Sequence, residues 1–325
     1  MIEIQRCHDK EQWDEYVLEH DGHPLQLWGW GQVKAAHGWT AERLCIFDDE
    51  KQVAAIQVLI RKLPFPFRSI AYAPRGPVGD SSYFSELLNL VAQFVKDEHK
   101  SVAFTVEPNS REINLTEVWQ KSSNNILSRE TILLNLEQAE SDLLSQMAKK
   151  TRQYIRKSAA DGVTISRVKS RTDLEECLTI YRQTAHRAGF NLHDEQYYRD
   201  VFQQMGDHSP IFMAKVDDVP VAFLWIAVSL ATAYELYGGM NDQGQSIRAN
   251  YTLKWHVIRK MKEWGVSDYD FGGLVAGGVS NFKQGWSPDP YEFAGTYDYP
   301  LSPLYSVWTS VLPKAKSFIQ RLKRR

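Results

Sequence analysis

The chain has 325 residues, of which 43% are hydrophobic and 24% are charged, and its formal net charge is −2. These values are typical of a soluble globular protein. They exclude an intrinsically disordered chain, and the small net charge argues against a protein that coats nucleic acid. A chain of this length is too long for one ordinary hydrophobic core, so we expect two domains.

The first half of the chain predicts helices, a hairpin, and a helix that leads into a strand. β-like runs lie on both sides of Asp48-Asp49-Glu50, which is typical of a hairpin, and a helical period of apolar residues begins at Ser82. The predicted elements of this half are a helix at 28–37, a hairpin at 44–61, an extended segment at 69–78, a helix at 82–99, and strands at 101–107 and 131–136.

A long basic helix is predicted next, at residues 141–161, with Gly162 as its C-terminal stop. Its basic residues Lys149, Arg152 and Arg156 recur at spacings of three and four, which places them on one helical face. Such a run is usually a solvated face. Binding of an anion such as an RNA backbone is the alternative interpretation.

The second half repeats the first in outline. Its predicted elements are helices at 172–188 and 194–205, a hairpin at 211–229 that turns at Asp217-Asp218, a strand ending at Tyr237-Gly238-Gly239, a helix at 249–264, and a strand at 268–271. Because the order of elements and the Asp-Asp turns agree, we expect two copies of one α/β (α+β) domain. Each copy would be a mixed sheet with helices on its faces, as in N-acyltransferases of the GNAT type.

The stretch 267–286, SDYDFGGLVAGGVSNFKQGW, predicts a short strand, then a glycine-dense loop that carries Lys283. Taken alone it is either a mobile surface turn or a functional loop on a rigid scaffold. The chain ends in a predicted helix at 303–325 with a basic end. That end is either a solvated terminus or a contact with an anionic membrane surface or RNA.

No metal site and no covalent nucleophile are expected. Cys7, Cys45 and Cys177 are widely spaced without a CxxC motif, and the sequence has no HExxH and no GxSxG. The N-terminus has no apolar signal-peptide core, and no apolar run approaches the roughly 20 residues of a membrane span. We therefore expect a cytoplasmic monomer without a cofactor, with peripheral contact at the cytoplasmic membrane face as a further expectation.

An ordered set of motifs resembles the FemABX family of non-ribosomal peptidyltransferases. The matching pieces are Trp28 with Lys34, Tyr72-Ala-Pro-Arg-Gly-Pro, the basic run 149–157, Tyr237-Gly-Gly, Tyr269-Asp-Phe-Gly-Gly and Asn281-Phe-Lys-Gln-Gly-Trp. The resemblance implies transfer of an amino acid from aminoacyl-tRNA to the stem-peptide amine of a peptidoglycan precursor in cell-wall cross-bridge synthesis. The acceptor would be UDP-MurNAc-pentapeptide or lipid II.

The same resemblance implies two tandem GNAT-like domains, 1–142 together with 298–325, and 143–297. The C-terminal helix would pack back on the first domain. No long heptad stretch occurs, so the chain is similar to the compact FemX-like type without a helical-hairpin arm.

The resemblance also assigns site residues. Lys283, in the pair Phe282-Lys283, would stabilise the tetrahedral oxyanion or hold the terminal adenosine and carboxylates. Glu107 would orient or deprotonate the incoming amine. The residues implied in precursor binding are Lys34, Tyr72, Arg75, His193, Tyr197 and Tyr237, and those implied in tRNA binding are Lys149, Arg152 and Arg156. His193 stands where compact members have an arginine on the nucleotide phosphates, so a UDP-linked precursor is in doubt and a lipid-linked one stays open.

Two other functions stay open from the sequence. A CoA-dependent GNAT acetyltransferase would cradle pyrophosphate on a Q/R-x-x-G-x-G/A loop between a strand and a helix. Residues 26–31 fit those letters but precede the first sheet strand, and residues 240–248, where the loop should follow the YGG strand, lack the pattern. A non-catalytic pair of GNAT-like domains that serves as a binding protein is the third possibility.

Overall fold

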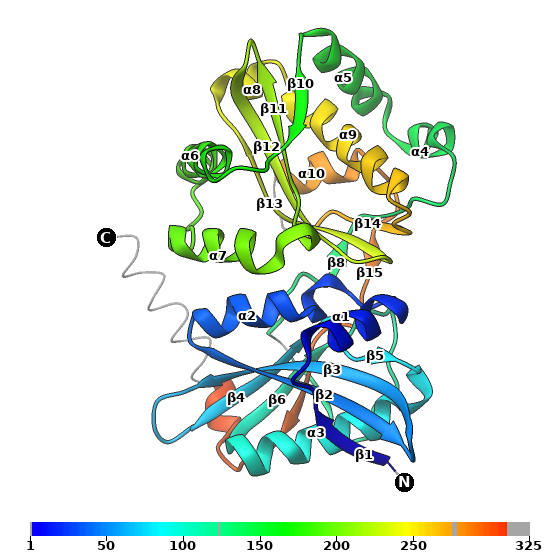
Figure 1. Cartoon of the computed structure of the whole chain (residues 1–325), viewed down its shortest axis with the longest axis vertical. Helices are drawn as coiled ribbons and strands as arrows, with labels where there is room; N and C mark the ends of the chain where they lie inside the picture. Colours follow the sequence, from blue (N-terminus) through cyan, green and yellow to red (C-terminus); the bar gives the residue numbers. More distant parts are fainter. Residues whose placement is uncertain (1, 123, 275–277, 311–325) are drawn as a thin grey trace. The chain divides into compact units, whose positions relative to one another are not determined.

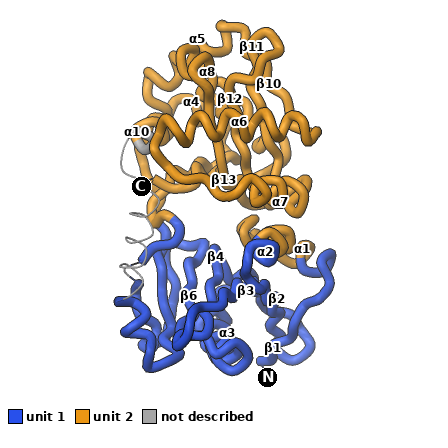
Figure 2. The backbone as a smooth tube through the Cα atoms, turned by 90° about the vertical axis from the view of Figure 1, so that its left-hand side faces the viewer, with its two compact units in different colours: residues 1–13, 34–127, 293–325 blue, residues 14–33, 128–292 orange. Residues whose placement is uncertain are grey.

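The computed structural model (Figure 1) describes residues 2–122, 124–274 and 278–310. Its contacts divide the chain into two compact units (Figure 2). Unit 1 comprises the described residues within 1–13, 34–127 and 293–325, and unit 2 those within 14–33 and 128–292. The division differs from the domain limits expected from the sequence mainly at 14–33 and 128–142. Whether either division marks independently folding domains stays a prediction.

Unit 1 is built on one mixed sheet. Within the described residues this sheet has eight strands in the order β1-β2-β3-β4-β6-β16-β7, with β5 paired to β3. The strands are β1 (Ile2–Arg6), β2 (Trp39–Asp48), β3 (Lys51–Lys62), β4 (Ser69–Pro74), β5 (Val78–Gly79), β6 (Ser101–Glu107), β7 (Gln120–Lys121) and β16 (Tyr297–Pro300). β1 to β4 form an antiparallel ladder, and β4 then runs parallel to β6.

The crossover into β6 is made by the short 3-10 helix η2 (Ser81–Tyr83) and by α3 (Phe84–His99). α3 buries one apolar stripe, which includes Leu88, Val91 and Val95. These residues recur at the helical period, so the helix predicted at 82–99 is confirmed. Two further helices, α1 (Lys10–Glu19) and α2 (Trp28–Ala36), run across the division between the units, with the 3-10 helix η1 (Pro24–Gln26) between them in the chain.

Unit 2 repeats the order of unit 1. Its sheet, in the described residues, has six strands in the order β10-β11-β12-β13-β14-β9, with β13 and β14 parallel. The strands are β9 (Leu133–Asn135), β10 (Thr164–Arg167), β11 (Ile211–Val216), β12 (Val219–Val228), β13 (Thr232–Met240) and β14 (Asp268–Asp270). A separate two-stranded sheet pairs β8 (Glu130–Thr131) with β15 (Tyr291–Glu292). The predicted duplication of one mixed α/β unit is therefore confirmed.

The helices of unit 2 flank this sheet. They are α4 (Glu140–Gln146), α5 (Lys149–Ala160), α6 (Arg171–Ala188), α7 (Glu195–Met205), the 3-10 helix η3 (Gly206–His208), α8 (Asp242–Ser246), α9 (Ala249–Glu263) and α10 (Gly278–Gln284). α6 begins at Ser170, whose side chain accepts a hydrogen bond from the Asp173 amide, and ends at Gly189 in the left-handed conformation. α9 is the crossover helix into β14.

Both hairpins turn at the predicted aspartates. Asp49 has φ +53, and Asp217 and Asp218 have φ +49 and +62. Aspartate enters this left-handed region more readily than most residues, because its short side chain can hydrogen-bond nearby backbone. The β2–β3 and β11–β12 pairs are antiparallel across these turns, so both hairpin predictions are confirmed.

Each sheet contains one strand from a distant part of the chain. β16, near the C-terminus, pairs with β6 of unit 1, and β9, which follows unit 1 in the chain, pairs with β14 of unit 2. The strand predicted at 131–136 is correspondingly split, because β8 pairs with β15 and β9 pairs with β14. The sheet of unit 1 is therefore complete only once the C-terminal segment has folded onto it.

The single helix predicted at 141–161 is wrong, because the helix is broken between α4 and α5. Met147 and Ala148 are extended, with ψ of 147° and 143°. The Ala148 amide donates to the Gly285 carbonyl at 2.9 Å. Arg152 donates to the carbonyls of Leu144, at 3.2 Å, and of Met147, which satisfies the end of α4.

The chain around Lys283 and the C-terminus also departs from expectation. Lys283 lies on α10 and not in a loop, so that part of the prediction is wrong. Residues 305–310 are helical, and the ring of Trp308 packs on Phe67 of unit 1, with 5.3 Å between ring centroids. This agrees with a C-terminal helix that packs on the first domain. The basic end predicted at 314–325 lies outside the described residues.

Candidate active site

The parallel strands β13 and β14 of unit 2 part at the end of their paired register. Tyr234 and Asp270 are the last pair, and the chain then leaves β14 through Gly272. Gly272 has φ +73, and a Cβ atom there would lie 2.4 Å from the Glu235 carbonyl oxygen. Only glycine fits this approach of one backbone to another. Backbone groups at the parting are thus left outside the sheet ladder.

The side chain of Lys283, on α10, extends to the point where β13 and β14 separate. Its Nζ donates to the carbonyl oxygens of Phe271 and Gly273, at 2.5 and 2.7 Å. Burial lowers the pKa of Lys283, and the carboxylates of Glu235 and Asp270 oppose that shift. An ammonium has three N–H donors, and these two bonds use two of them. The predicted site lysine therefore holds the glycine-rich segment after β14 in place.

A buried ion pair that the sequence did not predict lies within electrostatic range of Lys283. Lys254 of α9 is 5% exposed, and its Nζ donates to both carboxylate oxygens of Glu235, at 2.5 and 2.7 Å. The Tyr269 hydroxyl donates to the same carboxylate at 2.8 Å. Burial lowers the pKa of Lys254 to about 8, although the carboxylate of Glu235 favours its charged form.

Hydrogen bonds from β8 also hold the glycine-rich segment that follows β14. Asp270 is 1% exposed and accepts hydrogen bonds from the Thr131 hydroxyl at 2.5 Å and from the Gly272 amide at 2.8 Å. The Gly273 amide donates to the Thr131 hydroxyl at 3.1 Å. The segment through Gly273 is therefore held from two sides, which fixes the carbonyls that Lys283 contacts.

An aromatic cluster of α6, α7 and β13 brings together three of the residues predicted to bind the precursor. The His193 ring is exposed and stacks on Tyr197, with 4.2 Å between centroids. The hydroxyls of Tyr197 and Tyr237 hydrogen-bond each other, and burial raises the pKa of Tyr197 to about 12. Both phenols are therefore neutral donors or acceptors near neutral pH. Their contact with a precursor stays a prediction.

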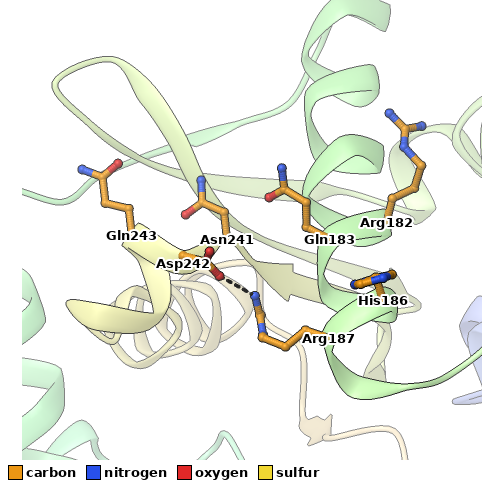
Figure 3. A pocket seen from close by; sticks show the side chains of 7 residues that line it. All are labelled: Arg182, Gln183, His186, Arg187, Asn241, Asp242 and Gln243. Carbon is orange, nitrogen blue, oxygen red and sulfur yellow. Dashed lines mark hydrogen bonds and ion pairs between the residues drawn. The ribbon is translucent and has the colours of Figure 1, made fainter.

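A surface pocket of about 780 Å³ lies between α6 and the junction of β13 with α8 (Figure 3). Its lining is Arg182, Gln183, His186, Arg187, Asn241, Asp242 and Gln243, which includes none of the predicted site residues. Arg187 reaches across from α6 to Asp242 at 3.2 Å and to the Met240 carbonyl at 2.7 Å, and Arg182 pairs with Glu195. Both guanidinium groups of the pocket are thus paired within unit 2.

The junction of β13 and α8 is where a CoA acetyltransferase would hold pyrophosphate on backbone amides. Here the Gly244 amide donates to the Asn241 side chain and the Gln245 amide to the Asn241 carbonyl, both at 2.9 Å. The other candidate loop, 26–31, lies on η1 and α2 and does not connect a strand to a helix. Neither segment offers the expected pyrophosphate cradle, which argues against the acetyltransferase.

In unit 1, the structure places Lys34 within electrostatic range of Arg61. Lys34 is on the last turn of α2, and Arg61 is near the end of β3. Burial, together with the positive charge of Arg61, lowers the pKa of Lys34 to about 8. The Arg61 guanidinium lies over the Trp39 ring at 5.3 Å. Two cations held near each other favour an anionic ligand, because an anion relieves their repulsion.

Glu107 lies at the end of β6 and is 2% exposed. Its carboxylate accepts hydrogen bonds from the Tyr72 hydroxyl, from Thr296 at 2.6 Å, and from the amides of Ile126 and Leu127 at 2.8 and 3.0 Å. All of these donors belong to unit 1. The geometry therefore favours an anchor that fixes the chain after β7, and the predicted role in deprotonating an amine has no support from these contacts.

Arg75 is part of the same buried region and is 4% exposed. Its amide donates to the Glu107 carbonyl at 2.7 Å, its guanidinium donates to the Pro108 carbonyl at 3.3 Å, and it lies 3.4 Å from the centroid of the Phe293 ring. Tyr72, Arg75 and Glu107 are thus brought together by the structure, as a buried cluster within unit 1.

The three basic residues predicted to form one face of α5 differ in their exposure to solvent. Lys149 and Arg156 are exposed, whereas Arg152 is half-buried and satisfies the carbonyls at the end of α4. Beside this face, the guanidinium of Arg248, which precedes α9, lies 4.4 Å from the ring centroid of the half-buried Tyr154 on α5. The exposed basic surface of α5 therefore excludes Arg152.

The thiols and the metal-ligating residues offer no further site. Burial raises the pKa of Cys45 to about 12 and that of Cys177 further, so both are neutral thiols near pH 7. Across residues 2–122, 124–274 and 278–310, no group of three His, Cys, Asp or Glu side chains is placed to hold a metal ion. None of the helices in this described part is long and apolar enough to cross a membrane.

Known proteins resemble this chain over nearly its whole length. The FemAB family model matches residues 9–124, 118–219 and 217–312. The lipid II:glycine glycyltransferase of Staphylococcus saprophyticus is 22% identical over 404 aligned residues, which cover 96% of this chain and 97% of that protein. That alignment is longer than this chain of 325 residues, so the relative contains insertions.

Two solved structures share the fold. The crystal structure of FemX superposes with a TM-score of 0.83 at 19% identity, covering 94% of this chain and all of that one. A tandem GNAT protein from the clavulanic acid biosynthesis pathway superposes with a TM-score of 0.54 at 9% identity, covering 93% of this chain and 99% of the other. In the described residues the longest helix is α6, with 18 residues, in keeping with a compact form without a helical-hairpin arm. The family match across almost the entire chain, on a fold shared with FemX, makes this protein a member of the FemAB family.

Proposed function

We propose that this protein transfers an aminoacyl group from an aminoacyl-tRNA to the stem-peptide amine of a peptidoglycan precursor. The observation that carries the proposal is that relatives matching 96% of the chain are named lipid II:glycine glycyltransferases. The geometry supports it, because a lysine ammonium stands where two parallel strands part. A fixed cation beside backbone polar groups is suited to a reaction in which negative charge develops on oxygen.

The reaction needs positioning more than strong chemical activation. The amine nitrogen forms a bond to the ester carbonyl carbon, and the bond from that carbon to the ribose oxygen breaks. The amine loses a proton and the ribose hydroxyl gains one, so no oxidant or further reactant is required. The tetrahedral intermediate carries an oxyanion, and we assign its stabilisation to the N–H of Lys283 that is not used on Phe271 and Gly273.

The acceptor we propose is the lipid-linked precursor. The relatives are named for lipid II, and His193 stands where the family resemblance implies an arginine that would favour a nucleotide-linked diphosphate. Lys34 and Arg61, two cations near each other in unit 1, would bind the diphosphate of the precursor.

Lys34→Met should raise KM for the precursor by about 10-fold or more and leave kcat nearly unchanged, because a charged hydrogen bond to a phosphate is worth roughly 1.5–3 kcal/mol. The pKa of Lys34 is lowered to about 8, so the bound cation is present below pH 8 and is lost above it. In the wild type KM should therefore rise between pH 7 and 9, and in Lys34→Met it should stay level. Steady-state kinetics across that range check both statements.

The matched control is Lys51→Met, an exposed lysine at the other end of β3. KM should stay at the wild-type value in this variant. A KM for Lys34→Met equal to that of the wild type would remove Lys34 from the precursor site.

The donor would lie with its phosphates on the exposed basic surface of α5. Lys149→Gln and Arg156→Gln should each weaken binding of charged tRNA, to a similar extent for tRNAs of different sequence, and should each reduce the slope of log Kd against log salt by about 1. Fluorescence titrations at several salt concentrations measure the slope. Lys169→Gln, which changes an exposed lysine before α6, is the control and should keep the wild-type slope. Unchanged slopes in both α5 variants would place the tRNA elsewhere.

The function is tested by comparing two acyl donors and two acceptors. The purified protein is incubated with lipid II or UDP-MurNAc-pentapeptide, together with a mixed pool of charged tRNAs or with acetyl-CoA. We expect the aminoacyl ester of the tRNA to be consumed only when an acceptor is present, and faster with lipid II than with the soluble precursor. We expect no acetylation of either acceptor by acetyl-CoA. Acetyl transfer from CoA, or ester loss that is independent of any acceptor, would overturn the proposal.

A further inference from the structure

The interior of unit 2 contains a second lysine that the proposed reaction does not use. Lys254 is 5% exposed on α9, and both oxygens of Glu235 accept hydrogen bonds from its Nζ. Removing an ammonium and a carboxylate from water is unfavourable, and such a pair rarely stabilises a fold better than apolar residues would. A purely structural reason for this pair is therefore weak, and its surroundings point to another role.

The pair adjoins the residues that hold Lys283. The Nζ of Lys254 lies 4.3 Å from the centroid of the Phe271 ring and 5.1 Å from that of Phe282. The carbonyl of Phe271 accepts a hydrogen bond from Lys283, and Phe282 precedes Lys283 on α10. Lys254 and Lys283 therefore approach the same two aromatic residues within one unit.

Glu235 is fixed more firmly than an ion pair alone would require. Besides Lys254, the hydroxyl of Tyr269 donates to it at 2.8 Å, and Tyr269 is fully buried on β14. The backbone of Glu235 is also in place, because Gly272 packs against its carbonyl oxygen. Its carboxylate is thus held in one orientation from α9 and from β14.

The charged groups that act on Lys283 come from the three elements around it. Glu235 on β13 and Asp270 on β14 favour its ammonium form. The ammonium of Lys283 lowers the pKa of Lys254 on α9, and this repulsion between the two cations is mutual. Asp270 is already engaged by Thr131 and the Gly272 amide. Among these charges, Glu235 and Lys254 act on Lys283 with opposite sign.

We propose that Glu235 is a positioning residue that keeps Lys283 protonated for the oxyanion, and that Lys254 and Tyr269 hold the Glu235 carboxylate in that role. The inference rests on the proposed function, because it assumes that Lys283 acts as a cation. It adds an internal counter-ion to the site, which neither the family motifs nor the names of the relatives supply.

The test is the pH profile of kcat at saturating precursor, which the titration of Lys34 does not affect, in three single variants. Activity needs the ammonium of Lys283, so it is lost as pH rises through the pKa of that group. Glu235→Gln removes a negative charge and should move this basic limb down by about one pH unit, whereas Lys254→Met removes a positive charge and should move it up. Lys260→Met changes a lysine on the same helix whose side chain is 40% exposed and pairs with Glu263, and it should leave the limb in place.

Opposite shifts are the expected signature, because loss of folding alone would lower activity at every pH without moving the limb. Lys254→Met leaves a buried carboxylate unpaired, so the double variant Glu235→Gln/Lys254→Met is measured as well. With both charges removed, its limb should lie between those of the two single variants. Shifts in the same direction, or no shift in either variant, would overturn the proposal.

A second readout separates this inference from the proposed function. Trace labelling of Lys283 with acetic anhydride at a series of pH values, followed by mass spectrometry, reports its titration without any substrate. Opposite shifts in labelling, in a protein that transfers no amino acid, would support the Glu235–Lys254 network and reject the proposed reaction. Transfer activity with labelling curves that coincide in all variants would support the reaction and reject the network.

Discussion

Lys283→Met should lower kcat for aminoacyl transfer by about 10²–10³-fold, with a smaller change in KM. This is the range measured when one donor to an oxyanion is removed. Methionine keeps a side chain of similar length, so packing beside Phe271 is largely retained while the charge and the donors are lost. Single-turnover measurements with charged tRNA and precursor in excess report the chemical step directly.

Lys283 also fixes the glycine segment, so a loss of structure has to be separated from a loss of chemistry. Lys283→Arg keeps a positive charge with donors at that position, and we expect it to retain the wild-type melting temperature and part of kcat. The thermal melt of Lys283→Met provides the comparison. A kcat for Lys283→Met within a factor of two of the wild type, in a folded protein, would exclude Lys283 from the chemical step.

Glu107→Gln should destabilise unit 1 by about 1–3 kcal/mol, the range found when a buried polar group loses its hydrogen-bond partner. The carboxylate accepts from Tyr72, Thr296 and the amides of Ile126 and Leu127, and it is 2% exposed. A glutamine amide turns an acceptor into a donor, so at least one donor of the cluster loses its partner.

Hydrogen exchange is the suitable measurement here, because a chain with two units need not unfold in one step. We expect faster exchange in β4, in β6 and in residues 124–127, with unit 2 unchanged. Glu98→Gln is the control, since Glu98 is exposed and its pair with Arg6 is worth less than about 1 kcal/mol. Wild-type exchange combined with a large loss of kcat in Glu107→Gln would restore the role in proton transfer that the motif implies.

Local patterns in the sequence were sufficient to predict the repeated unit. The aspartates at 49 and at 217–218 mark both hairpins because they enter the left-handed region there, and the apolar stripe of α3 marks its crossover. These signals are local, so they survive without knowledge of the tertiary structure. The ordered motifs then pointed to the family that the whole-chain match supports.

The pairing of β9 with β14 and the break between α4 and α5 depend on residues that are distant in the sequence. β9 has three residues and pairs with β14, more than 130 residues along the chain, and no local pattern specifies that pairing. Met147 and Ala148 leave the helix because the Ala148 amide bonds Gly285 and because Arg152 turns back to α4. Helix propensity alone, which is high along this run, predicts neither of these two contacts.

The Glu235–Lys254 pair could have been suspected, because Lys254 interrupts the apolar face of α9. It lies among Leu253, Val257 and Ile258, all buried, at spacings that place a charge on the buried side. Such a lysine needs a counter-ion, but the identity of Glu235 follows only from the folded sheet. Glu107 shows a different case, since its position in the motif did not reveal the hydrogen bonds that its carboxylate accepts, and its role in transfer stays a prediction.

Aminoacyl transfer to a peptidoglycan precursor would change the mass of the acceptor, and that mass is the decisive measurement. Purified protein is incubated with lipid II and a mixed pool of charged tRNAs, and the acceptor is analysed by mass spectrometry with fragmentation of the stem peptide. We predict an increase equal to one or more amino acid residues, located on the side-chain amine of the stem peptide and absent with Lys283→Met. An unchanged acceptor mass with both lipid II and UDP-MurNAc-pentapeptide would contradict the account.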